Sequence, residues 1–164
     1  MNPLSSIVAF GADHAGFTLK DRLAACVAGL GFGRLDLGTN QSDSVDYPDF
    51  AQRVCAAVNA GEARFGVLVC GTGIGMSIAA NRFPGIRCAL VQDATGAQLS
   101  RSHNDANVLA LGARLIGEQV ALDALSAFLT TVYEGGRHNR RLAKLDAVAP
   151  PWDANLKISI GAIG

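Results

Sequence analysis

Apolar residues along this chain form two repeating patterns, short continuous runs and longer segments with helical spacing. Short apolar runs bounded by turn residues are typical of buried strands. The predicted strands are 6–10, 34–37, 66–69, 87–91 and 108–111. Helical spacing predicts helices at 17–30, 47–60, 94–103, 117–133 and 137–147, and one more from the glycines around 73 to Arg82.

This alternation of strands and helices predicts an α/β fold, because each helix must return the chain to the same edge of a parallel sheet. We expect a Rossmann-like, three-layer αβα sandwich with a mainly parallel, five-stranded sheet. Such sheets bind ligands outside the carboxyl ends of their strands. The loops expected at that edge carry Asp13-His14, the segment 70–75 and the residues around Arg114.

The length of the chain favours one domain. It has 164 residues, of which 49% are hydrophobic, which is enough for one well-buried core and too few for two domains. We expect that domain to cover 1–149. The alternating pattern stops at Pro150-Pro151, so we treat 150–164 as a C-terminal extension.

Charge and hydropathy argue against nucleic-acid and membrane partners. The formal net charge is +0 and the longest basic run is Arg140-Arg141, so no nucleic-acid-binding face is indicated. No segment approaches the roughly 20 apolar residues of a membrane span, and the N-terminus shows no targeting pattern. We therefore expect a cytoplasmic protein that acts on a small molecule. Its four cysteines show no Cys-x-x-Cys spacing and are expected to be reduced.

The segment 67–81, VLVCGTGIGMSIAAN, joins a predicted strand to a predicted helix. Its glycines let an anionic ligand approach backbone N–H groups beside a helix N-terminus, which predicts a small anion site. A dinucleotide fingerprint is excluded because Met76 replaces its third glycine, and a Walker loop because no Lys-Ser or Lys-Thr follows. Cys70 lies at the lip of this loop, where a helix N-terminus favours a proton-abstracting thiolate. The other cysteines are expected to be structural: Cys26, Cys55 and Cys88.

Two histidines lie near predicted strand ends. His14 follows Asp13 in the first loop, and His103 begins the segment His-Asn-Asp-Ala-Asn at a predicted helix end. A lone histidine at such a position often only caps a helix, but two near strand ends favour catalysis. A metal site is not expected, because neither these residues nor Asp105 show a ligand spacing such as His-x-x-x-His.

Arg137 and Arg141 follow the pair Gly135-Gly136 and lie four residues apart, on one face of a predicted helix. Two guanidinium groups at this spacing suit a phosphate monoester. A solvated basic turn explains the same residues equally well, so both interpretations stay open at this point. The segment 46–49 is typical of the start of a helix.

Several ordered segments together resemble one known family. They are 11–16 (GADHAG), 46–50 (DYPDF), 70–81 (CGTGIGMSIAAN), 103–114 (HNDANVLALGAR) and 135–141 (GGRHNRR). The chain resembles the type B ribose-5-phosphate isomerases, a family that also contains galactose-6-phosphate and allose-6-phosphate isomerases. The resemblance extends to about Lys144.

This resemblance implies a cofactor-independent aldose–ketose isomerase that works through a cis-enediolate. Cys70 matches the family's proton-abstracting base, whereas some relatives use a glutamate at the position of Met76. His103 matches the group that opens the sugar ring, and Asp13 and Thr72 match contacts to substrate hydroxyls or a proton relay. The groups matched to enediolate stabilisation are Gly71, Thr72, Gly73, Ile74, Gly75 and Asn104, and those matched to phosphate binding are His14, Arg114, Arg137 and Arg141.

The resemblance also implies a homodimer or a dimer of dimers, in which the segment 103–114 reaches the neighbour's active site. The expected substrates are D-ribose 5-phosphate and D-ribulose 5-phosphate, with no cofactor and no metal. Two alternatives stay open: an isomerase of allose 6-phosphate, galactose 6-phosphate or a tetrose phosphate, and a non-catalytic sugar-phosphate sensor. A nucleotide-dependent dehydrogenase is a weaker third, because Met76 and the absence of an early glycine fingerprint oppose it. Cys70 and His103 argue against the sensor, because binding alone requires neither.

Overall fold

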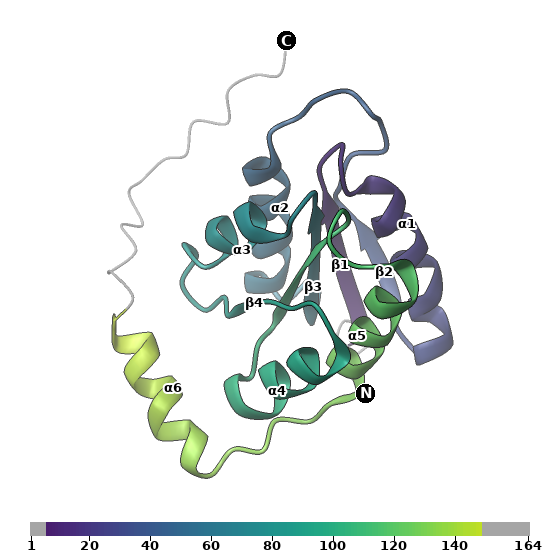
Figure 1. Ribbon diagram of the computed structural model, residues 1–164. Coiled ribbons are helices and arrows are strands. Elements are labelled where there is room, and N and C mark those ends of the chain that lie inside the picture. The colour runs from purple at the N-terminus through teal and green to yellow at the C-terminus, as the bar shows by residue number, and fades with distance from the viewer. Residues whose placement is uncertain (1–5, 149–164) are drawn as a thin grey trace.

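Five parallel strands form a single sheet, as predicted. The computed structural model describes residues 6–148, and Figure 1 shows the sheet between its helices. The strand order is β2-β1-β3-β5-β4, and every neighbouring pair is parallel. The strands are β1 (Ile7–Ala12), β2 (Gly33–Asp36), β3 (Phe65–Cys70), β4 (Cys88–Leu90) and β5 (Val108–Gly112). The predicted extension, 150–164, lies outside the described residues.

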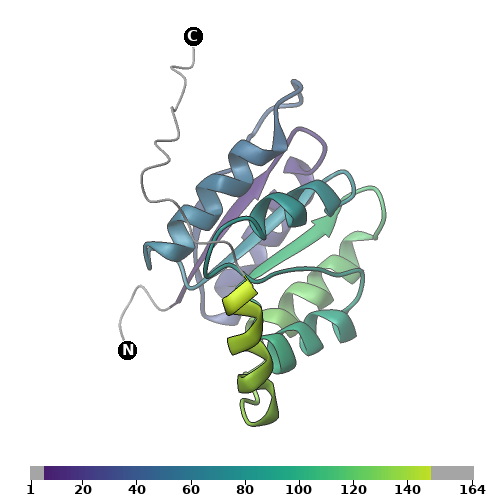
Figure 2. The ribbon, with the colours of Figure 1, turned by 90° about the vertical axis from the view of Figure 1, so that its left-hand side faces the viewer.

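Helices lie on either side of the sheet and make the three predicted layers (Figure 2). They are α1 (Phe17–Cys26), the 3-10 helix η2 (Val27–Leu30), α2 (Tyr47–Asn59), α3 (Ile74–Ala80), α4 (Ala94–Asn104), α5 (Glu118–Thr130) and α6 (Arg137–Val148). Buried residues of α1 and α5 pack on one face of the sheet, and those of α2 and α3 pack on the other. The α/β class predicted from the alternating pattern is confirmed.

The central strand explains how two cores form. Val67 and Val69 of β3 point toward α1 and α5, whereas Leu68 and Cys70 point toward α2 and α3, because successive side chains of a strand alternate. All six residues of β3 are buried. Burial on both faces is typical of a parallel sheet and supplies most of its stabilisation. The same alternation places the Cys70 thiol on the face where α3 begins.

Two helices end three or more residues before their predicted bounds. The predicted helix 17–30 is α-helical to Cys26 and then tightens into η2, which closes at Gly31 with a φ of 82°. The predicted helix 117–133 ends at Thr130, because Thr131 is extended with a ψ of 132°. The chain then leads to α6, which lies outside the layers, near α4 (Figures 1 and 2). Among residues 6–148, no helix combines the length and the apolar character that a bilayer crossing needs.

A buried lysine ties α1 to the loop after β2. Lys20 is 0% exposed, and its ammonium donates to the two carboxylate oxygens of Asp36 at 2.8 and 2.7 Å. It also donates to the carbonyl of Thr39 at 3.2 Å and to Oδ1 of Asn40 at 2.8 Å. A buried charge is tolerated only when it is paired and hydrogen-bonded in this way. Nothing in the local pattern predicts this pairing, since Lys20 resembles any other polar position of a helix.

We expect Asp36→Asn to lower the free energy of unfolding by about 2 to 3 kcal/mol, because it removes the charge of the carboxylate that pairs with the buried Lys20 ammonium through both oxygens. Chemical denaturation followed by circular dichroism measures this loss. The matched control is Asp21→Asn: the Asp21 carboxylate lies 3.1 Å from the same ammonium, but its side chain is 55% exposed. That substitution should cost less than about 1 kcal/mol. Equal losses in the two variants would contradict the role given to Asp36.

Candidate active site

Cys70 lies at the carboxyl end of β3, where the chain turns into α3. It is 4% exposed, and its Sγ accepts the backbone N–H of Gly73 at 3.1 Å. Gly73 has a φ of 75°, and a Cβ there would lie 2.9 Å from the carbonyl carbon of Leu111. Only glycine combines this conformation with this close approach. The loop therefore folds over the sulfur and points a fixed donor at it.

Three loops meet around Cys70 through their backbones. A Cβ on Gly16 would lie 2.3 Å from the carbonyl oxygen of Val69, and one on Gly112 would lie 2.6 Å from that of Thr72. These distances leave no room for a side chain. The loops after β1, β3 and β5 are thus in direct contact at the carboxyl edge of the sheet, as the fold class predicts.

The polar residues of the first loop are oriented by backbone donors. Oδ1 of Asp13 accepts the N–H groups of Ala15 and Gly16 at 2.9 and 3.0 Å. Nδ1 of His14 accepts the N–H of Val45 at 3.2 Å, which joins this loop to the one before α2. A carboxylate and an imidazole each have more hydrogen-bonding capacity than these contacts use. Both side chains are therefore held in place and still able to bind a ligand.

Arg114 follows β5 and lies against the glycine loop. Its N–H donates to the carbonyl of Gly71 at 2.9 Å, and a Cβ on Gly71 would lie 3.3 Å from Nη1. Beside it, Oγ1 of the exposed Thr72 accepts the N–H of Ile74 at 3.3 Å. An exposed cation next to backbone donors suits an anionic ligand. The structure gathers these predicted residues at one edge: Asp13, His14, Cys70, Gly71, Thr72, Gly73, Ile74, Gly75 and Arg114.

His103 lies at the other edge of the sheet, away from the loops that carry Asp13, Cys70 and Arg114. It lies in the last turn of α4, which runs antiparallel to the strands and ends at their amino ends. There, Nε of Arg87, the residue before β4, donates to the carbonyl of Asn104 at 3.1 Å. Along the strand direction, Arg87 lies roughly 16 Å from Cys70, given a strand rise of about 3.3 Å per residue.

Asp105 fixes the backbone at the end of α4, next to His103 and Asn104. It is the non-glycine residue with positive φ, 45°, among residues 6–148, and it ends α4. Its carboxylate accepts Nη2 of Arg87 and Nη1 of Arg101, each at 2.8 Å. Because Asp105 pairs with two arginines and Asp13 lies at the opposite edge, the metal site rejected in the sequence analysis is not assembled here.

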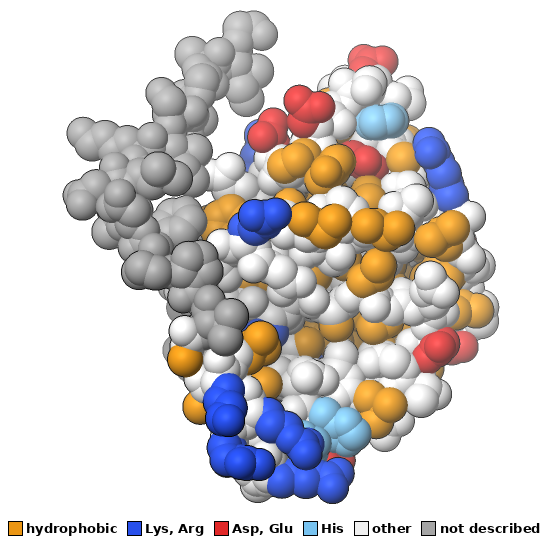
Figure 3. Space-filling view, turned by 60° about the vertical axis from the view of Figure 1, so that its left-hand side comes forward, with side chains coloured by type: hydrophobic (Ala, Val, Ile, Leu, Met, Phe, Trp, Pro, Cys, Tyr) orange, Lys and Arg blue, Asp and Glu red, His pale blue; other side chains and the backbone are white. Residues whose placement is uncertain are grey.

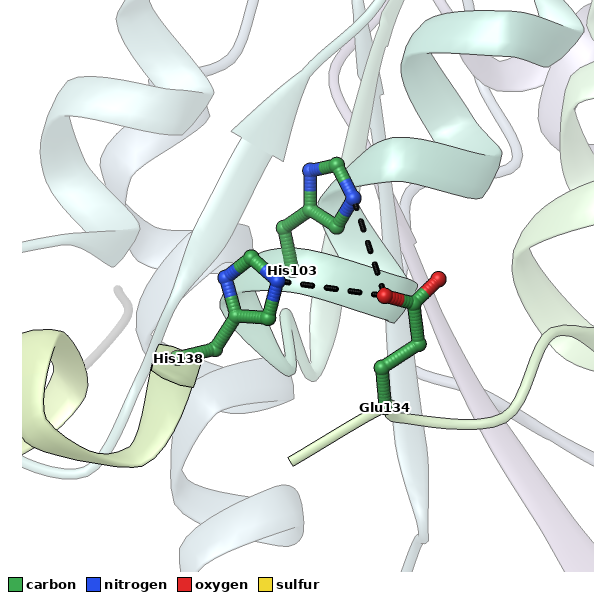
Figure 4. A group of neighbouring side chains, drawn as sticks. All are labelled: His103, Glu134 and His138. Atoms are coloured by element: carbon green, nitrogen blue, oxygen red, sulfur yellow. Dashed lines mark ion pairs between the residues drawn. The ribbon is translucent and has the colours of Figure 1, made fainter. Parts of the chain in front are cut away.

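His103, Glu134 and His138 form a cluster at this edge (Figure 4). Oε2 of Glu134 lies 3.9 Å from Nε2 of His103 and 3.8 Å from Nε2 of His138. The two imidazoles stack, with ring centroids 4.5 Å apart and planes inclined by 10°. His138 is 4% exposed, and Nε of Arg137 donates to its Nε2 at 3.4 Å. Burial lowers the pKa of His138, as do the positive charges around it, against the opposing effect of Glu134.

Sequence reasoning left this cluster undetected. It noted His138 without giving it a role, and it passed over Glu134. Their separation of four residues could have revealed that pair, but His103 comes from another helix and no local spacing connects it to them. Arg137 and Arg141 lie on α6 as predicted, and both are exposed.

A cavity of about 670 Å³ opens beside this group, between the α3–β4 connection, α4 and α6. Polar and apolar groups share its lining, which includes Arg82, Arg87, Cys88, Asn104 and Leu145. Of the predicted site residues, only Asn104 contributes to that lining. The cavity therefore does not connect the residues around Cys70 with the cluster of His103, Glu134 and His138.

Comparison with known proteins identifies the family. A family model described as Ribose/Galactose Isomerase matches residues 8–145. This chain belongs to that family. It is 47% identical over 141 residues to ribose-5-phosphate isomerase B of Escherichia coli strain K12, which covers 86% of this chain and 95% of that protein. The resemblance inferred from the ordered segments is confirmed.

Solved structures of ribose-5-phosphate isomerases share the fold. The enzyme of Thermotoga maritima is 48% identical, with a TM-score of 0.84 over 87% of this chain and 99% of its own. The type B enzyme of Clostridium thermocellum is 44% identical, with a TM-score of 0.85 over 87% of this chain and 96% of its own. The α/β architecture described above is therefore that of the ribose/galactose isomerase family.

The remaining cysteines of this family member lie in helices or strands, as predicted, and all four cysteines are free. Cys26 ends α1 and is exposed. Burial in α2 raises the pKa of Cys55 to about 12. Burial also raises the pKa of Cys88, and so does the neighbouring Cys55. Neither of these two thiols is suited to chemistry at neutral pH, in keeping with their predicted structural roles.

We expect iodoacetamide at pH 8 to modify Cys26 rapidly and to leave Cys55 unmodified. A thiol with a raised pKa of about 12 has roughly one part in ten thousand of its molecules as thiolate at that pH, and the thiolate is the reactive form. Peptide mass spectrometry after timed quenching measures both rates. Denatured protein, in which every cysteine reacts, is the control. Equal rates for the two residues in the folded protein would contradict the burial of Cys55.

Proposed function

We propose that this protein is a cofactor-independent aldose–ketose isomerase that interconverts D-ribose 5-phosphate and D-ribulose 5-phosphate. The observation that carries the proposal is the family match over 8–145 in a chain whose Cys70 stands at the lip of the glycine loop. Relatives named ribose-5-phosphate isomerase support the choice of substrate. A phosphorylated sugar does not cross a bilayer unaided, so a cytoplasmic location belongs to the same proposal.

Cys70 acts as the base. As a thiolate it removes the proton from C2 of the open-chain aldose, and the electron pair of that bond forms the double bond between C1 and C2. The charge then rests on O1 of a cis-enediolate. The thiol returns its proton to C1, and transfer of the O2 proton to O1 completes the ketose. The reaction moves protons and one double bond, so it requires no external oxidant or reductant.

The surroundings of Cys70 support this assignment. Met76 is 0% exposed and belongs to the same buried cluster as Cys70, so no carboxylate occupies the position where some relatives carry a glutamate. Within the loop, the N–H groups of Gly73 and Ile74 donate to Cys70 and Thr72. We assign the other amides of the loop to the enediolate oxygens, since fixed donors at a developing charge lower the barrier without reorganisation.

The other residues take the roles that the resemblance implies. His103 opens the sugar ring as an acid and base, because an imidazole can both donate and accept a proton. Asp13 and Thr72 contact substrate hydroxyls or relay protons, and Asn104 helps to stabilise the enediolate. The phosphate is held by side chains from both edges of the sheet: His14, Arg114, Arg137 and Arg141.

We further propose that two copies of the chain share each active site, in a homodimer or a dimer of dimers. Cys70 and His103 lie at opposite edges of the sheet, so one copy must supply the base and another the ring-opening group. Two further observations support a partner surface. A band of apolar side chains crosses the face shown in Figure 3, and Ile74 and Ile78 of α3 are 49% and 54% exposed. Apolar surface of this kind marks interaction sites.

Proton NMR of the purified protein with ribose 5-phosphate in deuterated water, without added metal or nucleotide, tests the function. We expect ribulose 5-phosphate to appear with deuterium at C1, because an enediolate mechanism exchanges the transferred proton with solvent. Conversion of allose 6-phosphate, galactose 6-phosphate or a tetrose phosphate instead would reassign the substrate. Binding of these sugars without any exchange would make the protein a sensor and reject the proposal.

Cys70→Ala should lower kcat/KM by at least about 100-fold while the protein stays folded, because it removes the only base assigned to the carbon-bound proton. The matched control is Cys26→Ala, which removes the exposed thiol of α1 and should keep wild-type turnover. Thermal unfolding followed by circular dichroism verifies the fold of both variants. Near wild-type turnover in folded Cys70→Ala would refute its role as the base.

Shared sites predict that two inactive variants restore activity together. In a mixed dimer of Cys70→Ala and His103→Asn, one site combines both substitutions and the other has neither. Random pairing should therefore recover about a quarter of wild-type turnover, since half of the dimers hold one intact site of two. Co-expression of the variants with different affinity tags allows the mixed dimer to be purified. An inactive mixed dimer would contradict the sharing of sites between copies.

A further inference from the structure

The proposed reaction leaves two members of one side-chain cluster without a role. The cluster consists of His103, Glu134 and His138. The reaction assigns a role to His103 alone. The three side chains come from α4, from the segment before α6 and from α6, and their potential ligand atoms all lie within 4.8 Å of one another. Two imidazole nitrogens and one carboxylate oxygen are a donor set that binds zinc in many proteins.

The distances from Glu134 to the two histidines fit a metal ion after a small contraction. Zinc with bonds of about 2.0 to 2.1 Å in tetrahedral geometry separates its ligand atoms by roughly 3.3 Å. Oε2 of Glu134 is 3.9 Å from Nε2 of His103 and 3.8 Å from Nε2 of His138. Each pair therefore has to close by about half an ångström. In Figure 4, both of these imidazole nitrogens lie on the side of the glutamate carboxylate.

The exposure of the three residues allows this closure. The side chain of His138 is 5% exposed and is held in place, whereas those of His103 and Glu134 are 35% and 58% exposed. Because the rings stack with their planes 10° apart, His103 has to turn its ring to point Nε2 at a shared ion. A partly exposed side chain can make that rotation without repacking the core.

The charges and the ligand types of the cluster decide which cations it can bind. Glu134 carries the negative charge that attracts a cation, whereas Arg137 opposes binding, because its Nε donates to Nε2 of His138 at 3.4 Å. A metal ion would have to displace that side chain. Magnesium and calcium prefer oxygen ligands and gain little from two imidazoles, whereas zinc and cobalt bind them well.

We propose that His103, Glu134 and His138 form a binding site for a divalent transition-metal ion of the zinc class, and that the bound ion blocks isomerisation. The ion occupies the nitrogen of His103 that would otherwise exchange protons with the sugar ring. This second part rests on the proposed function of His103, whereas the metal site itself does not.

Isothermal titration calorimetry of the full chain with zinc chloride tests the site without any substrate. We expect one zinc ion per chain and no heat of binding with magnesium chloride. Glu134→Gln should lower zinc affinity by at least about tenfold, since it removes a direct ligand. The matched control, Glu118→Gln, removes an exposed carboxylate at the start of α5 and should keep wild-type affinity. Equal affinity in the two variants would overturn the proposal.

Two further measurements make the assignment specific. Arg137→Gln should raise zinc affinity, because it removes the competing cation, and a misfolded variant would not show that gain. Cobalt bound at this site should show visible d–d absorption without the charge-transfer band of a thiolate ligand. A thiolate band that disappears in Cys26→Ser would place the metal on that exposed cysteine and overturn the site.

Activity separates the two parts of the proposal. Zinc should inhibit ribose 5-phosphate conversion with half-inhibition near the dissociation constant from calorimetry, and a chelator should restore the rate. If zinc binds but does not change the isomerisation rate, the proposed inhibition is wrong and the proposed metal site still stands. A protein that binds zinc but does not isomerise ribose 5-phosphate would instead reject the proposed function. An active isomerase without zinc binding would overturn the metal site.

Discussion

The common direction of the five strands decides at which edge of the sheet Cys70, Arg114 and His103 lie. In a parallel sheet each crossover helix runs back against the strands, so a residue that follows a strand lies at the carboxyl edge and a residue that ends a helix lies at the amino edge. Cys70 and Arg114 belong to the first class, and His103 to the second. The two classes of residue are therefore separated by the length of the strands, and the proposed sharing of sites between copies rests on that separation.

At the carboxyl edge the loops pack closely against their neighbours through their backbones. Gly16, Gly73 and Gly112 each lie where a Cβ would come within 3 Å of a neighbouring loop or strand. The N–H bond to Cys70 depends on that packing, since the loop can turn over the sulfur only at Gly73. Lys20 and Asp36 brace the neighbouring loop with a charge pair. The thiol is thus held by backbone geometry more than by other side chains.

The amino edge is organised by charge instead. Asp105 accepts two arginines at the end of α4, and Glu134 lies between two histidines beside a third arginine. Histidine, glutamate and arginine in such close proximity can bind a phosphate, exchange protons or hold a metal ion. These uses compete, because each needs the same nitrogen atoms or the same local charge. The proposed inhibition by zinc is one consequence of that competition.

The amino-acid sequence was sufficient to predict the alternating elements, the α/β class, the glycine loop with Cys70 and the family. These depend on local periodicity and on residues that are adjacent in the chain, such as the segment 70–75. The burial of Lys20 and the cluster around Glu134 emerged only from the folded structure. Each depends on contacts between elements far apart in sequence, which no local pattern encodes.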